Sequence, residues 1–312
     1  MVAIQCFGAA ARTGFVSGLI ALSFAPGLSA QAPDYSKVEY RTEKLTDNLY
    51  VLFGAGGNVA VLTGVDGALV VDADVVELSP KLRAALSLLS DRPPRFLIDT
   101  HFHLDHAGGN VSLGRDGAVI VAHDNVRKHL MTRQTVNPGV EIVTEPTARE
   151  GLPVVTFKDG LRLHFNDDVV EVVHVEKAHT DSDALVFFEH ANVLHTGDVF
   201  MSQGYPFIDA GNGGSLDGVI AGAEQALKFC DAKTRVIPGH GTVAGTAELR
   251  AYRDMLVTIR QRVADLVNKR RTVEQVLAAS PTKDFDERWG KGFITPAAFT
   301  QRVFIEQMNA HK

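Results

Sequence analysis

The sequence predicts an α/β protein in which two β-sheets pack face to face and helices cover the outer faces. Two observations support this prediction: short β-branched runs alternate with helix-spaced leucines in both halves of the chain, and ligand-type polar side chains follow several of these runs. With 312 residues, of which 45% are hydrophobic, the chain can form one large domain or two small ones.

The first half combines a strand meander with one helix. Glycine-punctuated runs predict three strands, at Leu49–Phe53, Val59–Thr63 and Ala68–Val71. Leucine and alanine at helical spacing predict a helix over Glu77–Ser90, and an apolar run predicts a buried strand over Arg95–Asp99. A strand after a helix indicates a βαβ step, so the segment after Thr100 lies where open α/β sheets bind ligands.

The second half repeats this pattern. Apolar runs predict five strands, at Val154–Phe157, Val169–Val175, Ala184–Phe188, Val193–Thr196 and Thr234–Ile237. Ser215 is placed to cap a helix that ends near Phe229. From about Ala247 onward we expect a helical C-terminal extension with a break at Pro281.

Residues 1–30 are predicted to form a signal peptide. Arg12 precedes an apolar run from Gly14 to Ala25, and the small residue Ala30 suits cleavage after it. The run is shorter than the roughly 20 apolar residues of a membrane-spanning helix. We therefore expect a periplasmic or secreted mature chain, residues 31–312, with no membrane attachment after cleavage. Cys230 is its only cysteine, so no internal disulfide is expected.

Charge argues against a nucleic-acid partner. The formal net charge is -6 and the two signs are interspersed, whereas phosphate binding needs a clustered basic face. A small molecule is the expected partner, and the sequence leaves the oligomeric state open.

Residues 100–106, Thr-His-Phe-His-Leu-Asp-His, carry the strongest chemical signal. If the segment stays extended, alternation puts His101, His103 and Asp105 on one side, while His106 must turn the corner. The cluster can therefore serve two adjacent ions. Neutral imidazole and carboxylate ligands suit zinc.

Three further ligand-type residues follow other predicted strands: His179, Asp198 and His240. Taken alone, either histidine is more often structural, and a lone aspartate at a strand end is usually a turn residue or helix cap. Together with the histidine-rich segment, they favour a metal site.

In these motifs the chain resembles the metallo-β-lactamase superfamily, whose hallmark is His-x-His-x-Asp-His followed by a distant His, an Asp or Cys, and a last His. The resemblance extends from about Leu45 to about Asp254 and matches five segments in order. It implies a four-layer αββα sandwich over the mature chain, with a shallow cleft at the sheet edges.

The resemblance also implies two Zn²⁺ per chain. The ligands of the first zinc would be His101, His103 and His179, and those of the second would be Asp105, His106 and His240. Asp198 would bridge both ions, and Asp72 matches a buried aspartate that steadies the histidine-rich segment. The histidines that match no ligand position are His123, His129, His164, His174, His190 and His195.

The chemistry implied is acyl hydrolysis of a β-lactam, a lactone or a related ester or amide. A hydroxide shared by two zinc ions would attack the carbonyl, and Asp105 would orient this hydroxide and move its proton. Met201 stands where cysteine-type β-lactamases often have a lysine that grips the drug's carboxylate, so the usual β-lactam anchor is missing.

Two loops are expected to line the cleft, Gly54–Asn58 and Met201–Gly214. Their glycines permit mobility. Tyr205 and Phe207 in the second loop either suit an apolar cyclic acyl compound or pin the loop to the core.

Other functional classes stay open. Persulfide dioxygenases share the His-x-His-x-Asp-His motif but hold one iron with two histidines and an aspartate. Glyoxalase-type thioesterases share an aspartate like Asp198, although export argues against a cytosolic glutathione thioester. A zinc-storage protein would not need the open coordination position of a catalytic site. His103 argues against flavodiiron proteins, which have glutamate at that position.

Overall fold

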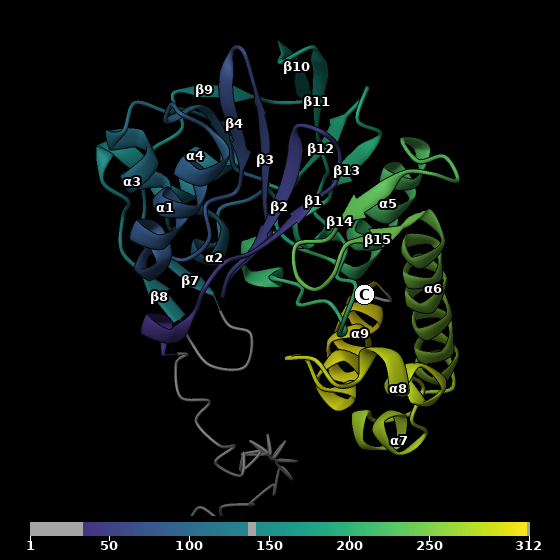
Figure 1. The fold of residues 1–312 in the computed structure, drawn as a ribbon. Coiled ribbons are helices and arrows are strands. Elements are labelled where there is room, and N and C mark those ends of the chain that lie inside the picture. Colours follow the sequence, from purple (N-terminus) through teal and green to yellow (C-terminus); the bar gives the residue numbers. More distant parts are fainter. Residues whose placement is uncertain (1–33, 137–141, 311–312) are drawn as a thin grey trace, which may run out of the picture. The chain divides into compact units, whose positions relative to one another are not determined.

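Two mixed β-sheets form the centre of the structure. The computed structural model describes residues 34–136 and 142–310 (Figure 1), so the predicted signal peptide lies outside the described residues. The larger sheet has the order β1-β2-β3-β4-β5-β6-β9, with strands Arg41–Lys44, Leu49–Phe53, Val59–Gly64, Gly67–Val71, Pro94–Ile98, Val119–His123 and Val155–Phe157. The second has the order β10-β11-β12-β13-β14-β15, with strands Gly160–Phe165, Asp168–His174, Ala184–Phe188, Val193–His195, Arg235–Ile237 and Ala244–Gly245.

Alternating side chains explain why the sheets stack. In β4, Leu69 and Val71 belong to the core between the sheets, whereas Val70 packs toward the outer helices. Val172 of β11 and Val186 of β12 enter the same inner core from the second sheet. Because successive side chains point to opposite faces, these strands are apolar on both sides.

Helices cover both outer faces. On the first sheet, α1 (Ser79–Leu89) and α3 (Asn110–Arg115) pack through Leu82, Leu86 and Leu113. On the second sheet, α5 (Leu216–Lys228) and α6 (Thr246–Asn268) bury their apolar faces. Figure 1 shows α1, α3 and α4 (Asp124–Leu130) on one side of the sheets and α5 and α6 on the other. The predicted αββα sandwich is confirmed.

The histidine-rich segment follows the predicted βαβ step. Strands β4 and β5 pair in parallel and are connected through α1. The segment does not stay extended beyond His103, because helix α2 begins at Leu104 and ends at Ala107. The amides of His106 and Ala107 donate to the His103 carbonyl at 3.0 and 2.8 Å. The turn therefore redirects both Asp105 and His106.

Several short elements were not predicted. Strands β6 and β10 belong to the two main sheets, and β7 (Gln134–Val136) pairs with β8 (Ile142–Thr144) as a separate hairpin. The 3-10 helices η1 to η6 are Tyr35–Lys37, Val76–Leu78, Arg149–Gly151, Gly197–Val199, Ala210–Asn212 and Lys283–Phe285.

The chain ends in four helices. After α6 come α7 (Val273–Ala278), α8 (Asp286–Trp289) and α9 (Pro296–Ala310). Helix α6 buries Leu249, Leu256 and Val263, which recur every seven residues and so form one stripe that faces the core. Within residues 34–136 and 142–310, none of the helices has the length and hydrophobicity of a membrane span.

Candidate metal centre

Four chain segments that follow strands meet at one edge of the sandwich. They come after β5, β11, β13 and β14, and they bring together all seven side chains predicted as ligands. Three groups have potential ligand atoms within 4.8 Å of one another: His101, His103 and His179; His101, His106 and Asp198; and Asp105, His106 and His240.

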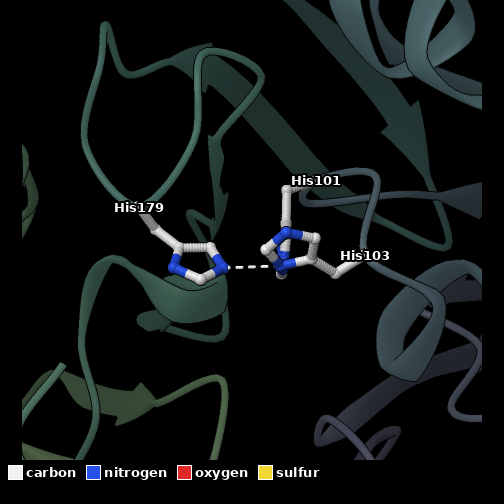
Figure 2. Close-up of side chains that lie close together, drawn as sticks. All are labelled: His101, His103 and His179. Carbon is white, nitrogen blue, oxygen red and sulfur yellow. Dashed lines mark hydrogen bonds between the residues drawn. The ribbon is translucent and has the colours of Figure 1, made fainter. Parts of the chain in front are cut away.

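The first group consists of three buried histidines. Figure 2 shows the ring of His179 opposite those of His101 and His103. His103 Nδ1 and His179 Nε2 lie 2.8 Å apart. The ring planes are nearly perpendicular, at 80° for His101 and His103 and 89° for His101 and His179. The nitrogen atoms can therefore converge on one point without stacking of the rings.

The second group is more open to solvent. His106 Nε2 and His240 Nε2 lie 3.3 Å apart, and His240 Nε2 lies 3.3 Å from Asp105 Oδ2. The side chain of His106 is fully buried, whereas those of His240 and Asp105 are 28% and 42% exposed. The side of the candidate centre that is open to solvent is therefore the side of Asp105 and His240.

Asp198 lies between the two groups. Its Oδ1 atom is 3.2 Å from His106 Nε2 and 3.4 Å from His240 Nε2. Its Oδ2 atom is 3.5 Å from His179 Nε2. Each carboxylate oxygen thus faces a different group, which is the arrangement that a bridging ligand requires.

The outward-facing nitrogens of three histidines act as hydrogen-bond donors. His179 Nδ1 donates to the Phe207 carbonyl at 2.8 Å, His103 Nε2 to Asp209 Oδ2 at 3.0 Å, and His106 Nδ1 to Asp72 Oδ2 at 2.7 Å. A neutral imidazole carries only one N–H group. When each ring is neutral, as a metal ligand must be, its second nitrogen therefore presents a lone pair to the centre.

His101 follows the same pattern. The Thr100 hydroxyl donates to Asp72 Oδ2 at 2.8 Å, so its oxygen is left to accept from His101 Nδ1 at 3.1 Å. His101 Nε2 is buried and has no hydrogen-bond partner among the described residues. Four nitrogen lone pairs thus face one small space.

These facing lone pairs fit metal ions. A tetrahedral ion with bonds of about 2.1 Å separates its ligand atoms by about 3.4 Å. The observed separations of 2.8 and 3.3 Å between histidine nitrogens are close to this value. At 2.8 Å, the facing lone pairs of His103 Nδ1 and His179 Nε2 repel unless a cation lies between them. Imidazole and carboxylate donors suit zinc, and imidazole also suits copper, iron and nickel.

The sequence also matches a known protein family. The family model described as the metallo-beta-lactamase superfamily matches residues 52–257, about two thirds of the chain. The chain belongs to the metallo-beta-lactamase superfamily. No curated protein sequence matched it.

Solved structures of the superfamily share the fold. A metallo-beta-lactamase from Pontibacter korlensis has a TM-score of 0.58 and 16% identity, with 70% of this chain and 99% of that chain covered. The DIM-1 metallo-beta-lactamase has a TM-score of 0.56 and 19% identity, with 71% of this chain and 99% of that chain covered. These relatives match through nearly their whole length, whereas about three tenths of this chain has no counterpart in them.

Within this superfamily fold, Asp72 supports the histidine-rich segment as the resemblance implied. It is fully buried at the end of β4 with a positive φ of 63°. Its Oδ1 atom accepts from the Thr100 amide at 2.7 Å, and its Oδ2 atom accepts from the Thr100 hydroxyl and from His106 Nδ1. One carboxylate thus orients His106 directly and His101 through Thr100.

Asp209 and Phe207 are supporting residues that sequence reasoning missed in these roles. Asp209 is 3% exposed and fixes His103, while the Phe207 carbonyl fixes His179. The Phe207 ring also lies 6.0 Å from that of His103 at an angle of 27°. The sequence indicated these two residues only by their position in the loop that follows Asp198.

Asn58 and Gly57 form a second support that was not predicted. The Asn58 side chain donates to the carbonyls of Pro238 and Gly241, at 2.8 and 3.0 Å, on either side of His240. Gly57 packs so tightly against the His106 ring that a Cβ atom at this position would overlap it. The predicted loop Gly54–Asn58 therefore contacts ligand residues directly.

The electrostatic environment differs between the two groups. Burial lowers the pKa of His179 to about 4 and lowers that of His101 well below its usual range, so both rings favour the neutral form that ligates metals. At His240, burial is outweighed by Asp198 and Asp105, which raise its pKa to about 10. The second group therefore attracts positive charge, as a proton or as a metal ion.

The structure also places Tyr205 and the histidines that were not predicted as ligands. Tyr205 is 1% exposed and part of the core, so it does not line the cleft. His195 is buried in β13, where its Nε2 atom donates to the Asn58 carbonyl at 2.9 Å. The three groups of potential ligands include none of the histidines set aside by the sequence, which are His123, His129, His164, His174, His190 and His195.

Proposed function

We propose that the chain is an exported dinuclear zinc hydrolase that cleaves an acyl bond of a small molecule, such as a β-lactam, a lactone or a related ester or amide. The observation that carries the proposal is the convergence of four histidine lone pairs on a space where Asp198 offers one oxygen to each group. Membership of the metallo-beta-lactamase superfamily supports a metal-dependent hydrolase.

The proposed ligands are those inferred from the sequence. His101, His103 and His179 would hold one ion, Asp105, His106 and His240 the other, and Asp198 both. When bound, two zinc ions would make water acidic enough to act as a nucleophile near neutral pH and would polarise the substrate carbonyl.

Asp105 is the proposed catalytic residue. Its Oδ2 atom faces His240, so its Oδ1 atom is available to accept a proton from the attacking water and to return it to the leaving group. Its side chain is 42% exposed and lies on the side of the candidate centre that is open to solvent. Buried His101 and His106 close the opposite side and exclude bulk water there.

Fewer features of the structure bear on the substrate class than on the metal site. Phe207 is half-buried beside His103 and His179, so one wall next to the first group is apolar. An acyl substrate with an apolar part would contact this wall. The similar structures include the DIM-1 metallo-beta-lactamase exposed to ceftazidime, so β-lactams belong in the first set of substrates tested.

The test is metal analysis of the purified protein, followed by assays on β-lactams, lactones, thioesters, phosphoesters and sulfate esters. Close to two zinc ions per chain, with acyl hydrolysis that Asp198→Asn abolishes, would support the proposal. One iron per chain with oxygen uptake on a persulfide would instead indicate a dioxygenase. Activity confined to thioesters would indicate a glyoxalase-type enzyme, and zinc binding without any turnover would indicate storage.

Export rests on the sequence of residues 1–30. We expect the mature chain to begin at Gln31 and to lie in the periplasm or outside the cell. Mass spectrometry of the protein recovered outside the cytoplasm of an expressing bacterium is the test. An intact Met1 in that material would contradict export by cleavage.

A further inference from the structure

The loop between η4 and α5 connects the candidate ligands with the C-terminal helices. On its inner side, the Phe207 carbonyl accepts from His179 Nδ1 and Asp209 accepts from His103 Nε2. The Asp209 amide also donates to the His179 carbonyl at 2.9 Å. Two of the three histidines in the first group are therefore oriented by this loop.

The outer side of the same loop is held by the C-terminal helices. The Tyr205 ring stacks on Phe299 of α9, with centroids 4.8 Å apart and planes 8° apart. The Tyr205 hydroxyl donates to Asp286 Oδ1 of α8 at 2.8 Å. Gly204 has a positive φ of 95° and lies against Gly292, where an added Cβ atom would come within 2.7 Å of the Gly204 Cα atom.

The C-terminal end of the loop also contacts helix α9. Glu306 of α9 accepts from the amide of Leu216, the first residue of α5, at 2.8 Å. Phe299 and Glu306 are seven residues apart, so they lie on the same face of α9. One helix thus contacts the chain on both sides of Phe207 and Asp209.

The elements that make these contacts lie outside the family match, which ends at residue 257. The contacts are therefore not part of the region that the family model describes.

We propose that the C-terminal helices α8 and α9 position His103 and His179 through the loop 204–216, with Tyr205, Phe299 and Glu306 as the positioning residues. This inference rests on the proposed function, in which His103 and His179 bind the first metal ion. Loss of the outer contacts lets Phe207 and Asp209 shift, which removes the fixed orientation of both histidine rings. The first ion then binds more weakly, while the second, held by Asp105, His106 and His240, is affected less.

The experiment uses the full chain loaded with cobalt(II), whose visible spectrum reports ligand geometry, and removes the metal by titration with a chelator. Phe299→Leu keeps an apolar side chain but removes the stacked ring, and Tyr205→Phe keeps the ring but removes the hydroxyl. We expect each to weaken binding of one of the two ions roughly tenfold and to change the cobalt spectrum, as changes to residues behind a ligand do.

Two further variants separate positioning from general stability. Val276→Ala creates a cavity in the same buried cluster from α7, so it should lower the melting temperature while leaving both metal affinities and the spectrum unchanged. Glu306→Gln keeps an acceptor for the Leu216 amide and should retain near wild-type binding, whereas Glu306→Ala should not.

The outcomes are distinguishable. If Phe299→Leu and Tyr205→Phe lower the melting temperature as Val276→Ala does but keep wild-type spectra and affinities, the positioning role is overturned and the proposed function stands. If the wild-type chain itself binds no pair of metal ions, the proposed function is overturned, and this inference with it.

Discussion

Asn58 Nδ2 donates to the Pro238 carbonyl at 2.8 Å across 180 residues of sequence. The same group donates to the Gly241 carbonyl at 3.0 Å, so one side-chain amide just before β3 of the first sheet holds both sides of the His240 turn, which follows β14 of the second sheet. The Asn58 carbonyl in turn accepts from His195. The position of a candidate ligand therefore depends on a contact between the two sheets.

Replacing Asn58 with alanine tests this dependence. The change leaves two carbonyl groups beside His240 without their donor, and the buried one, of Pro238, then costs about 1–3 kcal/mol. We expect the free energy of unfolding to fall by about that amount and metal affinity to fall roughly tenfold. Chemical denaturation and chelator titration measure the two effects. Gln225→Ala removes a hydrogen bond to the His174 carbonyl, which lies away from the candidate ligands. This variant should change the free energy of unfolding but not the metal affinity.

Asp198→Asn is expected to cost far more activity than Asp72→Asn. A bridging carboxylate offsets the repulsion between two adjacent dications, so its neutralisation should release one ion and raise the pKa of the reacting water. Asp72 contacts His106 at Nδ1, the ring nitrogen that faces away from the centre. Changes to residues that support a ligand in this way typically lower metal affinity or activity 10- to 100-fold. Turnover and zinc content of both variants provide the measurement.

Asp72→Asn is a suitable comparison because asparagine tolerates the positive φ at this position. Both variants should keep the circular dichroism spectrum of the wild type. Equal losses of activity, or full zinc occupancy in Asp198→Asn, would show that Asp198 is not a bridging ligand.

Gly57→Ala should displace the His106 ring. The added Cβ atom would overlap ring atoms of His106, and Asp72 prevents the ring from turning away. We expect at least a tenfold loss of affinity for one metal ion, measured by chelator competition, with little change in secondary structure. Gly245→Ala in β15 is the control, because the nearest atom to its Cβ would be Oε2 at the end of the flexible Glu248 side chain, at 3.3 Å. Equal metal binding in both variants would contradict the close packing at Gly57.

Acid stability should depend on His123. Burial, together with the stacked ring of His174 at 3.8 Å, lowers the pKa of His123 to about 4. The unfolded chain, with a pKa of about 6.5, takes up this proton first as the pH falls. The contribution of His123 to stability is thus complete above about pH 6.5 and is lost as the pH falls toward 4.

His123→Asn removes the titrating ring but can keep the cap of α4, since His123 accepts from the Asn125 amide and asparagine caps helices well. Urea unfolding between about pH 7 and about pH 4 should show a shallower loss of stability in this variant than in the wild type. His164→Asn, at an exposed position on β10, should follow the wild type. Parallel curves for wild type and His123→Asn would contradict the prediction.

The sequence alone determined the layers of the fold and which residues are candidates for the metal centre. Alternating apolar residues such as Leu69, Val70 and Val71 encode a strand buried on both faces, and this periodicity is local. The set of candidate ligands could also be predicted from the sequence, because residues 101–106 lie together in the chain and the other three candidates each follow an apolar run.

Only the tertiary structure decided how these side chains are oriented. Asp209 and His103 are 106 residues apart, and Tyr205 reaches Asp286 across 81 residues. No local pattern distinguishes such an aspartate from a turn residue, or Tyr205 from a cleft residue. The ligand types follow from short segments, whereas the hydrogen bonds that direct each lone pair inward form only when distant loops pack against one another. The short helix at Leu104 also follows from this packing, because the Gly57 amide donates to the Asp105 carbonyl at 2.8 Å and so fixes the turn that redirects His106.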